Sequence, residues 1–353
     1  MRIHASIKAL GLVLVSGLLL AACTSEPAPG AAGASTVRLL THDSFVVSQA
    51  LIDKLKADTG ITLEVVTAGD AGAMVAGAVL ASGSPSGDVM FGIDNTLLSK
   101  AVDADVFSAY TAGDSTQLIT GLQDDTAGGL VTPIDYGDVC VNIDDRWFAK
   151  HHLAAPTSLD QLAAPEYQDL LVVEDPASSS PGLAFMLATI AKYGDGWAKY
   201  WERLDANGVK VSGSWTDAYE SVFSGGKGDR PLVVSYATSP PAEIVYSEDP
   251  KPSKPSTSVM TEGCYRQIEF AGVLRGTANE AGARKVVDWL LSAPVQADVP
   301  LSMFVFPARA DVPLPEVFTR FAAKVADPLQ LTAQDVNAHL DEWLRAWGQV
   351  MGR

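Results

Sequence analysis

The stretch TVRLLTHDSFVVSQALIDKLKADTGITLEVVTA, residues 36–68, decides the fold class of this chain. Its two ends, residues 36–42 and 61–68, are short runs rich in Val, Leu, Ile and Thr, which is typical of strands. Between them, residues 48–60 place apolar side chains at helical spacing and end on Gly60, a common helix terminator. A strand, a helix and a second strand in this order predict a parallel βαβ unit.

The same alternation continues along the chain. Residues 71–83 predict another helix and residues 87–94 a buried strand. Further strands are predicted at residues 169–176, 209–212 and 231–237, and further helices at residues 181–194, 214–226 and 279–292. The sequence therefore predicts an α/β fold of mostly parallel sheets flanked by helices.

The amino terminus has the pattern of an export signal. Two basic residues precede the apolar stretch of residues 9–22, which is too short to span a membrane and is followed by small and polar residues. It ends in Leu-Ala-Ala-Cys, which resembles a bacterial lipobox, so Cys23 is expected to carry lipid; an ordinary signal peptide with a coincidental cysteine is the alternative. We predict a signal peptide over residues 1–22, a lipidated flexible tether over residues 23–36 and a protein anchored to the outer face of the cell membrane.

The charge of the chain excludes several classes of partner. Residues 1–22 hold two of the 25 basic residues and none of the 42 acidic residues, so the remaining 331 residues carry a formal net charge of −19. Such a surface repels phosphate backbones and anionic lipid, which argues against nucleic acid and against membrane contact other than through the lipid. It attracts cationic ligands. A length of 331 residues exceeds what one hydrophobic core usually supports, so two lobes are expected.

Seven short motifs occur in an order and spacing that resemble those of the thiamine-binding proteins, the substrate-binding components of ABC uptake transporters. They are THDSF (41–45), FGIDNTLL (91–98), TPIDYGDVCVNID (132–144), DPASSSPGLAF (175–185), SWTDAY (214–219), VVSYATSPP (233–241) and FVFPA (304–308). The resemblance implies a two-lobed fold of the type II periplasmic-binding-protein superfamily, which closes on its ligand and delivers it to a permease. It places lobe 1 at residues 37–138 and 266–353 and lobe 2 at residues 139–265.

The resemblance also implies a set of ligand-binding residues. Thiamine offers a flat aminopyrimidine, a cationic thiazolium and a hydroxyethyl arm that can carry phosphate, so its site needs aromatic faces, a carboxylate and a polar end. Trp215 and Tyr236 match positions that flank the rings, with burial beside Tyr219 and at a strand end as the structural alternatives. Asp70, followed by Ala71, matches a ligand-contacting aspartate and also suits a helix N-cap.

Asp43 lies on the opposite rim, where capping a helix that starts within residues 44–49 is its simpler role. The three serines before Pro181 invite a more specific interpretation. If Ser180 caps the helix, Ser179 and its neighbours present hydroxyl and N–H groups at a helix N-terminus, which favours an anion or a hydroxyl. The resemblance places Ser179 and Ser180 at the ligand, where we expect them, with Ser239, to receive the hydroxyethyl or phosphate end. A serine-rich turn without ligand contact is the alternative.

Three positions depart from the family pattern. His42 and Ala242 stand where relatives have tyrosine, and Phe304 stands where one relative has tryptophan. Two aromatic faces are therefore lost and one is reduced, so the site is expected to be looser or suited to another pyrimidine. His42 either stacks on the ligand or has a structural role.

Besides Cys23, the chain contains two cysteines, Cys140 and Cys264. Because an exported protein lies outside the reducing cytosol, these two cysteines can pair. The resemblance places them on the two crossovers between the lobes, which lie side by side. This placement implies a disulfide, with two buried free thiols as the alternative.

Catalytic signatures are absent from the sequence. SGGK, residues 224–227, fits Ser-x-x-Lys, but its glycines break the helix that this chemistry requires. The chain has no HExxH, no phosphate-binding loop and no Cys/His cluster with metal spacing. An iron-binding relative would show adjacent tyrosines, whereas SYATS contains only Tyr236. We expect a monomer with no cofactor and no metal. The alternatives are a protein that binds another organic cation or pyrimidine, then iron or a polyamine, and lastly a secreted thiamine-phosphate hydrolase.

Overall fold

The computed structural model describes residues 36–123, 127–248 and 250–353. The predicted signal peptide, Cys23 and all of the predicted tether except Thr36 lie outside the described residues. No helix in the described part combines the length and the apolar character that crossing a bilayer requires.

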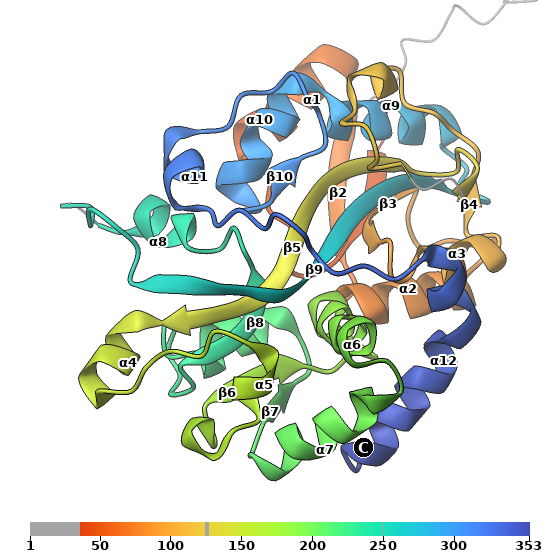
Figure 1. The fold of residues 1–353 in the computed structure, drawn as a ribbon. Coiled ribbons are helices and arrows are strands. Elements are labelled where there is room, and N and C mark those ends of the chain that lie inside the picture. The colour runs from red at the N-terminus through yellow and green to blue at the C-terminus, as the bar shows by residue number, and fades with distance from the viewer. Residues whose placement is uncertain (1–35, 124–126, 249) are drawn as a thin grey trace, which may run out of the picture. The chain divides into compact units, whose positions relative to one another are not determined.

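One mixed sheet organises the chain from residue 36 onward (Figure 1). Its first half follows the predicted βα alternation and contains β1 (Thr36–Thr41), α1 (Gln49–Thr59), β2 (Thr62–Thr67), α2 (Ala71–Leu80), β3 (Val89–Asp94), α3 (Leu98–Asp103), β4 (Phe107–Ser108) and η1 (Ser115–Gln117). The strands β2, β1 and β3 are parallel neighbours. α1 ends at Gly60, which adopts the left-handed conformation (φ 73°), as the sequence predicts.

Two long antiparallel strands, β5 (Thr132–Asp144) and β9 (Thr257–Leu274), connect this half to the other (Figure 1). The carboxyl end of β9 pairs with β3, and the carboxyl end of β5 pairs with β8 (Leu232–Tyr236). The sheet order is therefore β2-β1-β3-β9-β5-β8-β6-β7. The predicted α/β class is confirmed, although the two expected sheets form a single sheet with antiparallel strands at its centre.

The second half of the sheet consists of β8, β6 and β7, which are parallel neighbours. Its remaining elements are α4 (Asp145–His151), α5 (Leu159–Leu162), η3 (Pro165–Tyr167), β6 (Leu171–Glu174), α6 (Ser180–Tyr193), η4 (Gly194–Gly196), α7 (Trp197–Ala206), β7 (Lys210–Ser212), η5 (Asp217–Val222) and α8 (Pro241–Tyr246). The helix predicted over residues 214–226 is too long: the helical backbone stops at Val222, the end of the short π-helix η5, because the chain becomes extended at Phe223 and then turns at its glycines.

The carboxyl-terminal part returns to the first half of the sheet and then leaves it. It contains α9 (Glu280–Leu291), α10 (Ala293–Ser302), β10 (Phe306–Pro307), α11 (Glu316–Phe321) and α12 (Ala333–Val350). α12 contacts α7 and α3. Trp347 packs edge-to-face on Trp201 of α7 with ring centroids 5.6 Å apart, and Asp341 pairs with Lys100 of α3 at 2.6 Å. The lobe boundaries given above remain a prediction.

Burial of both faces explains the uninterrupted apolar strands. In β1, Leu39 joins the apolar cluster that contains α9, while Leu40 joins the cluster that contains α2. In β3, Phe91 joins the cluster that contains α9, and Met90 joins the cluster that contains α2. Helices therefore cover both faces of this half, so its strands need no polar face.

Candidate functional site

A cavity of about 330 Å³ lies where strands from both halves of the sheet end. The segments that form it follow the carboxyl ends of β1, β2, β6, β7 and β8, together with part of β9 and the segment before β10. Its lining residues are His42, Asp43, Ser44, Val46, Asp70, Ser180, Pro181, Trp215, Thr216, Tyr219, Glu220, Tyr236, Ser239, Ala242, Tyr246, Glu269, Ser302, Met303, Phe304 and Val305. The crevice at the carboxyl ends of strands is where open α/β sheets usually bind ligands.

Most of the residues predicted from the sequence line this cavity. They are His42, Asp43, Asp70, Ser180, Trp215, Tyr236, Ser239 and Phe304. Ala71 and Ser179 do not line it. Ala71 is buried as the first residue of α2, and Ser179 is fully buried behind the start of α6.

Trp215 and Tyr219 form an aromatic wall of the cavity. Their rings stack with centroids 5.0 Å apart and planes inclined by 16°. The indole N–H of Trp215 donates to Ser235 Oγ at 2.9 Å, which fixes the orientation of the ring. Trp215 thus packs on Tyr219 and also faces the cavity. Tyr219 was not among the ligand-binding residues predicted from the sequence, although its position four residues after Trp215 in SWTDAY was a signal for it.

Asp70 connects the two halves of the sheet. Its Oδ1 accepts a hydrogen bond from the backbone N–H of Ala71 at 2.6 Å, which caps α2, and its Oδ2 accepts from the backbone N–H of Trp215 at 2.9 Å. Asp70 therefore has both of the roles that the sequence suggests: it caps a helix and it lines the cavity. The second bond crosses from the first half of the sheet to the second.

A backbone contact lies beside this carboxylate. The N–H of Ala73 donates to the carbonyl of Ser178 at 3.3 Å. The approach depends on Gly72, because a Cβ atom at this position would lie 2.7 Å from the carbonyl carbon of Ser178. The two sides of the cavity therefore touch directly at its edge.

The predicted cap role of Asp43 is wrong. Residues 44–48 form no helix, and α1 begins at Gln49 with Ser48 in the N-cap position. Asp43 Oδ1 instead lies 3.5 Å from Thr216 Oγ1, again across the cavity. Burial and the nearby charge of Asp70 raise the pKa of Asp43.

The three serines before Pro181 have three different surroundings. Ser178 Oγ donates to the carbonyl of Gly213 at 2.7 Å. Ser179 occupies the N-cap position of α6 but makes no side-chain cap bond, and its Oγ has no partner in the described part of the chain. Ser180 is the first helical residue, and its Oγ accepts from Gln267 Nε2 at 2.9 Å. The expectation that Ser180 caps the helix is therefore wrong.

Tyr236 and Ser239 are held by polar contacts at the end of β8. The hydroxyl of Tyr236 donates to Gln267 Oε1 at 3.0 Å. Ser239 Oγ lies 2.9 Å from Ser235 Oγ and accepts from the backbone N–H of Tyr236 at 3.2 Å. Gln267 thus links Tyr236 to Ser180 through its side-chain amide.

Glu269 lies in the cavity wall and was not predicted from the sequence. It lies on β9 opposite Asp135 of β5, and its Oε2 is 3.7 Å from His42 Nε2. Burial and the adjacent Glu269 raise the pKa of Asp135, because two neighbouring buried carboxyl groups resist simultaneous ionisation. Burial alone would lower the pKa of His42, but the carboxyl groups of Glu269, Asp70 and Asp43 together outweigh it and the pKa is raised. A glutamate within the apolar run IEFAGVL was the available signal.

The charged side chains of the lining are almost all acidic. Asp43, Asp70, Glu220 and Glu269 contribute carboxyl groups, and no lysine or arginine belongs to the lining within residues 36–123, 127–248 and 250–353. A cavity of this composition favours a cation with flat, apolar rings.

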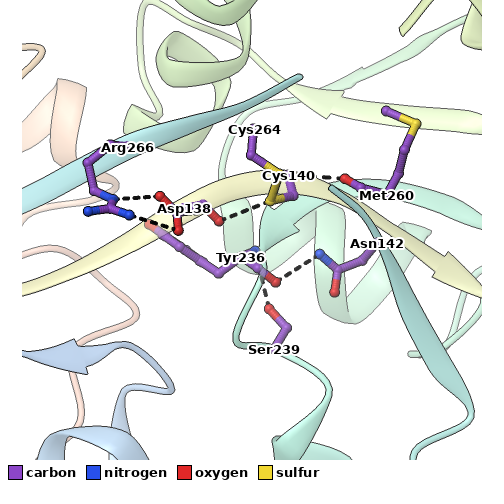
Figure 2. Close-up of a disulfide and its surroundings, with 8 residues drawn as sticks. All are labelled: Asp138, Cys140, Asn142, Tyr236, Ser239, Met260, Cys264 and Arg266. Carbon is purple, nitrogen blue, oxygen red and sulfur yellow. Dashed lines mark hydrogen bonds and ion pairs between the residues drawn. A yellow bond between two sulfur atoms is a disulfide. The ribbon is translucent and has the colours of Figure 1, made fainter. Parts of the chain in front are cut away.

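A disulfide joins Cys140 of β5 to Cys264 of β9, with Cα atoms 4.4 Å apart (Figure 2). It lies where the register between the two strands shifts, between Val139 and Val141. Arg266 donates from Nε to Asp138 Oδ1 at 2.5 Å close by (Figure 2). The disulfide and the ion pair both bridge the crossover strands and lie outside the cavity lining.

In the part of the chain that the structure describes, no group of three or more His, Cys, Asp or Glu side chains is arranged to hold a metal ion. The residues SGGK form turns after η5, so Ser224 and Lys227 do not share a helical turn.

Comparisons with known proteins give a consistent result. The profile of the family described as bacterial extracellular solute-binding protein matches residues 84–329. The thiamine-binding periplasmic protein of Salmonella typhimurium is 29% identical over 318 residues, which cover 89% of this chain and 92% of that protein. The thiamine-binding periplasmic protein of Escherichia coli is 28% identical with the same coverage. A solved periplasmic thiamin binding protein superposes with a TM-score of 0.79 and 25% identity, covering 90% of this chain and 96% of that chain.

Proposed function

We infer that this chain, which belongs to the bacterial extracellular solute-binding proteins, is the extracytoplasmic component of an ABC importer and captures thiamine for delivery to the permease. Its two-lobed fold is that of the type II periplasmic-binding proteins. The observation that carries the choice of ligand is the composition of the cavity: the stacked Trp215 and Tyr219 lie together with four carboxyl groups and no lysine or arginine among the described lining residues.

Each part of thiamine finds a suitable surface in this arrangement. We place the rings between Trp215 and Tyr236, since a cationic heterocycle stacks well on aromatic faces. The carboxylates of Asp70 and Asp43 offset the positive charge of the thiazolium. Ser180 and Ser239 receive the hydroxyethyl arm, because both are polar residues of the cavity lining. Ser179, which lies behind the lining, supports the turn and does not contact the ligand.

Thiamine without phosphate is the preferred form. A phosphate group in this cavity would meet acidic side chains with no lysine or arginine from the described lining to balance its charge. The backbone N–H groups at the start of α6 are the remaining favourable partners for an anion. We therefore expect thiamine phosphates to bind more weakly than thiamine.

The protein acts by binding and has no covalent chemistry. We propose that Cys23 carries lipid, that the protein is anchored by this lipid to the outer face of the cell membrane, and that it works as a monomer. The second candidate ligand is another flat organic cation, which the same aromatic and acidic lining would accept. An iron role has less support, because SYATS lacks the adjacent tyrosines expected of an iron-binding relative and the described residues hold no group of three or more His, Cys, Asp or Glu side chains arranged for a metal ion.

Two measurements test this proposal. The purified protein is denatured, and any released small molecule is identified by mass. The refolded, ligand-free protein is then titrated calorimetrically with thiamine, thiamine monophosphate, spermidine and ferric citrate. Thiamine is expected to bind most tightly and to be recovered unchanged after incubation. Tighter binding of spermidine or ferric ion, or conversion of thiamine phosphate into thiamine, would contradict the proposed function.

A further inference from the structure

Tyr246 is an aromatic side chain that lines the cavity yet remains largely in solvent. It is the last residue of α8, and 67% of its surface is exposed. It is the one aromatic residue among the large, strongly exposed hydrophobic side chains of the described chain; the others are Val46, Val65, Leu80 and Leu301. An exposed tyrosine at the edge of a cavity has surface available to cover a ligand.

Phe304 faces Tyr246 from the other side of the cavity. The two rings lie edge-to-face with centroids 5.4 Å apart. Phe304 belongs to the segment between α10 and β10, and β10 pairs with β5, whereas α8 follows β8 in the second half of the sheet. The pair therefore spans the cavity. Phe304 has φ 55°, a costly conformation for an aromatic residue, which persists only where the surrounding structure enforces it.

Ala242 lies one helical turn before Tyr246. Residues four apart project from the same side of a helix, and both of these residues line the cavity. The small side chain of Ala242 leaves room beside the tyrosine ring, so a ligand that passes over Ala242 meets the face of Tyr246.

The helix that carries Tyr246 is held in place. The carboxylate of Glu243 accepts hydrogen bonds from the backbone N–H groups of Ser256 at 2.9 Å and Thr257 at 3.0 Å. These bonds attach α8 to the start of β9 and to the residue before it. The backbone of the helix that carries the tyrosine is thus held at Glu243, which reduces the ordering that ligand binding requires.

We propose that Tyr246 is a specificity-determining residue that, together with Phe304, forms an outer aromatic wall over the cationic end of the ligand. This role rests on the proposed function and adds to it a second aromatic pair in the lining, besides Trp215 and Tyr219. Because the attraction between a cation and an aromatic face depends on the charge, this wall selects a cationic heterocycle over its neutral pyrimidine fragment.

The test compares two ligands with three variants of the full mature protein. Thiamine and the neutral 4-amino-5-hydroxymethyl-2-methylpyrimidine are titrated calorimetrically into the wild type, Tyr246→Ala, Tyr246→Phe and Leu80→Ala. Leu80 is the matched control, because it is 90% exposed at the end of α2 and does not line the cavity. Tyr246→Ala is expected to weaken thiamine binding about tenfold and pyrimidine binding by about twofold or less.

Tyr246→Phe keeps the aromatic face and is expected to stay within about twofold of the wild type for thiamine, as is Leu80→Ala. An unchanged Kd in Tyr246→Ala, or equal losses for both ligands, would overturn the role of Tyr246 while leaving thiamine binding intact. A wild type that does not bind thiamine would overturn the proposed function and this inference with it. Thermal unfolding of the ligand-free variants shows whether each one is folded.

Discussion

Asp70 accepts a hydrogen bond from the backbone N–H of Trp215 at 2.9 Å, and this bond joins the start of α2 to the loop that presents the indole ring. The other carboxylate oxygen caps α2 through Ala71. One buried side chain therefore positions the aromatic wall while it also contributes negative charge to the cavity.

Asp70→Asn should weaken thiamine binding more than Asp43→Asn does. An asparagine can offer only one oxygen acceptor, so either the cap of α2 or the bond to Trp215 is lost, at a cost of about 1–3 kcal/mol in the free energy of unfolding. Among the described residues, the side chain of Asp43 has one hydrogen-bond partner, Thr216 at 3.5 Å, so its replacement removes charge and little structure. Calorimetry and urea unfolding of both variants check this. Equal effects of the two substitutions would show that Asp70 acts through its charge alone.

Gly72→Ala should weaken thiamine binding at least about tenfold, since the new Cβ would press on the carbonyl of Ser178 and hold the two sides of the cavity apart. Gly77→Ala, on the same helix, is the control, because nothing lies within 4 Å of its Cβ position. That substitution should raise the free energy of unfolding by about 0.5–1 kcal/mol and leave the Kd unchanged. A Gly72→Ala protein with the wild-type Kd would mean that binding does not need this contact.

Ser180→Ala and Ser179→Ala should differ in their effect on binding. Ser180 lines the cavity, so its loss should weaken thiamine binding by about threefold to tenfold, which is the worth of one hydrogen bond. Ser179 is fully buried, and its hydroxyl has no partner among the described residues, so Ser179→Ala should leave the Kd unchanged. Titration calorimetry measures the Kd for thiamine of both variants. A larger loss of thiamine affinity in Ser179→Ala than in Ser180→Ala would indicate that Ser179 contacts the ligand.

The stability of the protein should depend on pH through Asp94. Burial raises the pKa of this carboxyl from 3.8 to about 7, although its Oδ1 accepts three hydrogen bonds from Thr96 and Leu97. A raised pKa in the folded state gives a stabilising contribution that is fully present below the unfolded pKa and is lost as the pH rises through about 7. The melting temperature of Asp94→Asn should therefore rise relative to the wild type between pH 5 and pH 8. Asp195→Asn, at an exposed position, should run parallel to the wild type.

Loss of the disulfide should affect stability more than binding. Its removal in Cys140→Ala/Cys264→Ala should lower the free energy of unfolding by about 2–5 kcal/mol, because the bond closes a long loop in the unfolded chain. Neither cysteine lines the cavity, so the Kd for thiamine should change little. Mass analysis of unreduced, alkylated protein shows whether the bond forms. Alkylation of both Cys140 and Cys264 would favour the alternative of two buried free thiols.

The elements with a strong local signal could be predicted from the sequence. The apolar run of β3 and the glycine after α1 depend on burial and backbone conformation, which the local sequence determines directly. The prediction of a helix over residues 214–226 was wrong in its carboxyl-terminal end, because the glycines allow the chain to turn back after Phe223. A periodic apolar pattern alone did not reveal where that helix would stop.

Within the cavity, single-residue predictions succeeded where a motif marked the position, as for Trp215. Those that depended on the exact start of a helix failed: α6 begins one residue earlier than expected, so Ser180 lies inside the helix and Ser179 takes the cap position. Glu269 was missed because a glutamate within an apolar run indicates a buried charge but does not show that its strand borders a cavity. Tyr246 was missed because its partner Phe304 is distant in the sequence and meets it only in the folded chain.

The carboxyl-terminal helix has a consequence for how readily the cavity can open. Asp341 of α12 pairs with Lys100 of α3, and Trp347 of α12 packs on Trp201 of α7. α12 therefore connects two helices that belong to different halves of the sheet. A hinge rotation about β5 and β9 must stretch or slide at least one of these contacts. The apparent affinity of a binding protein scales with the fraction of molecules in the competent state. No residue of α12 lines the cavity. Substitutions in α12 would therefore change the apparent affinity by changing the fraction of molecules in the competent state, without altering any contact to the ligand.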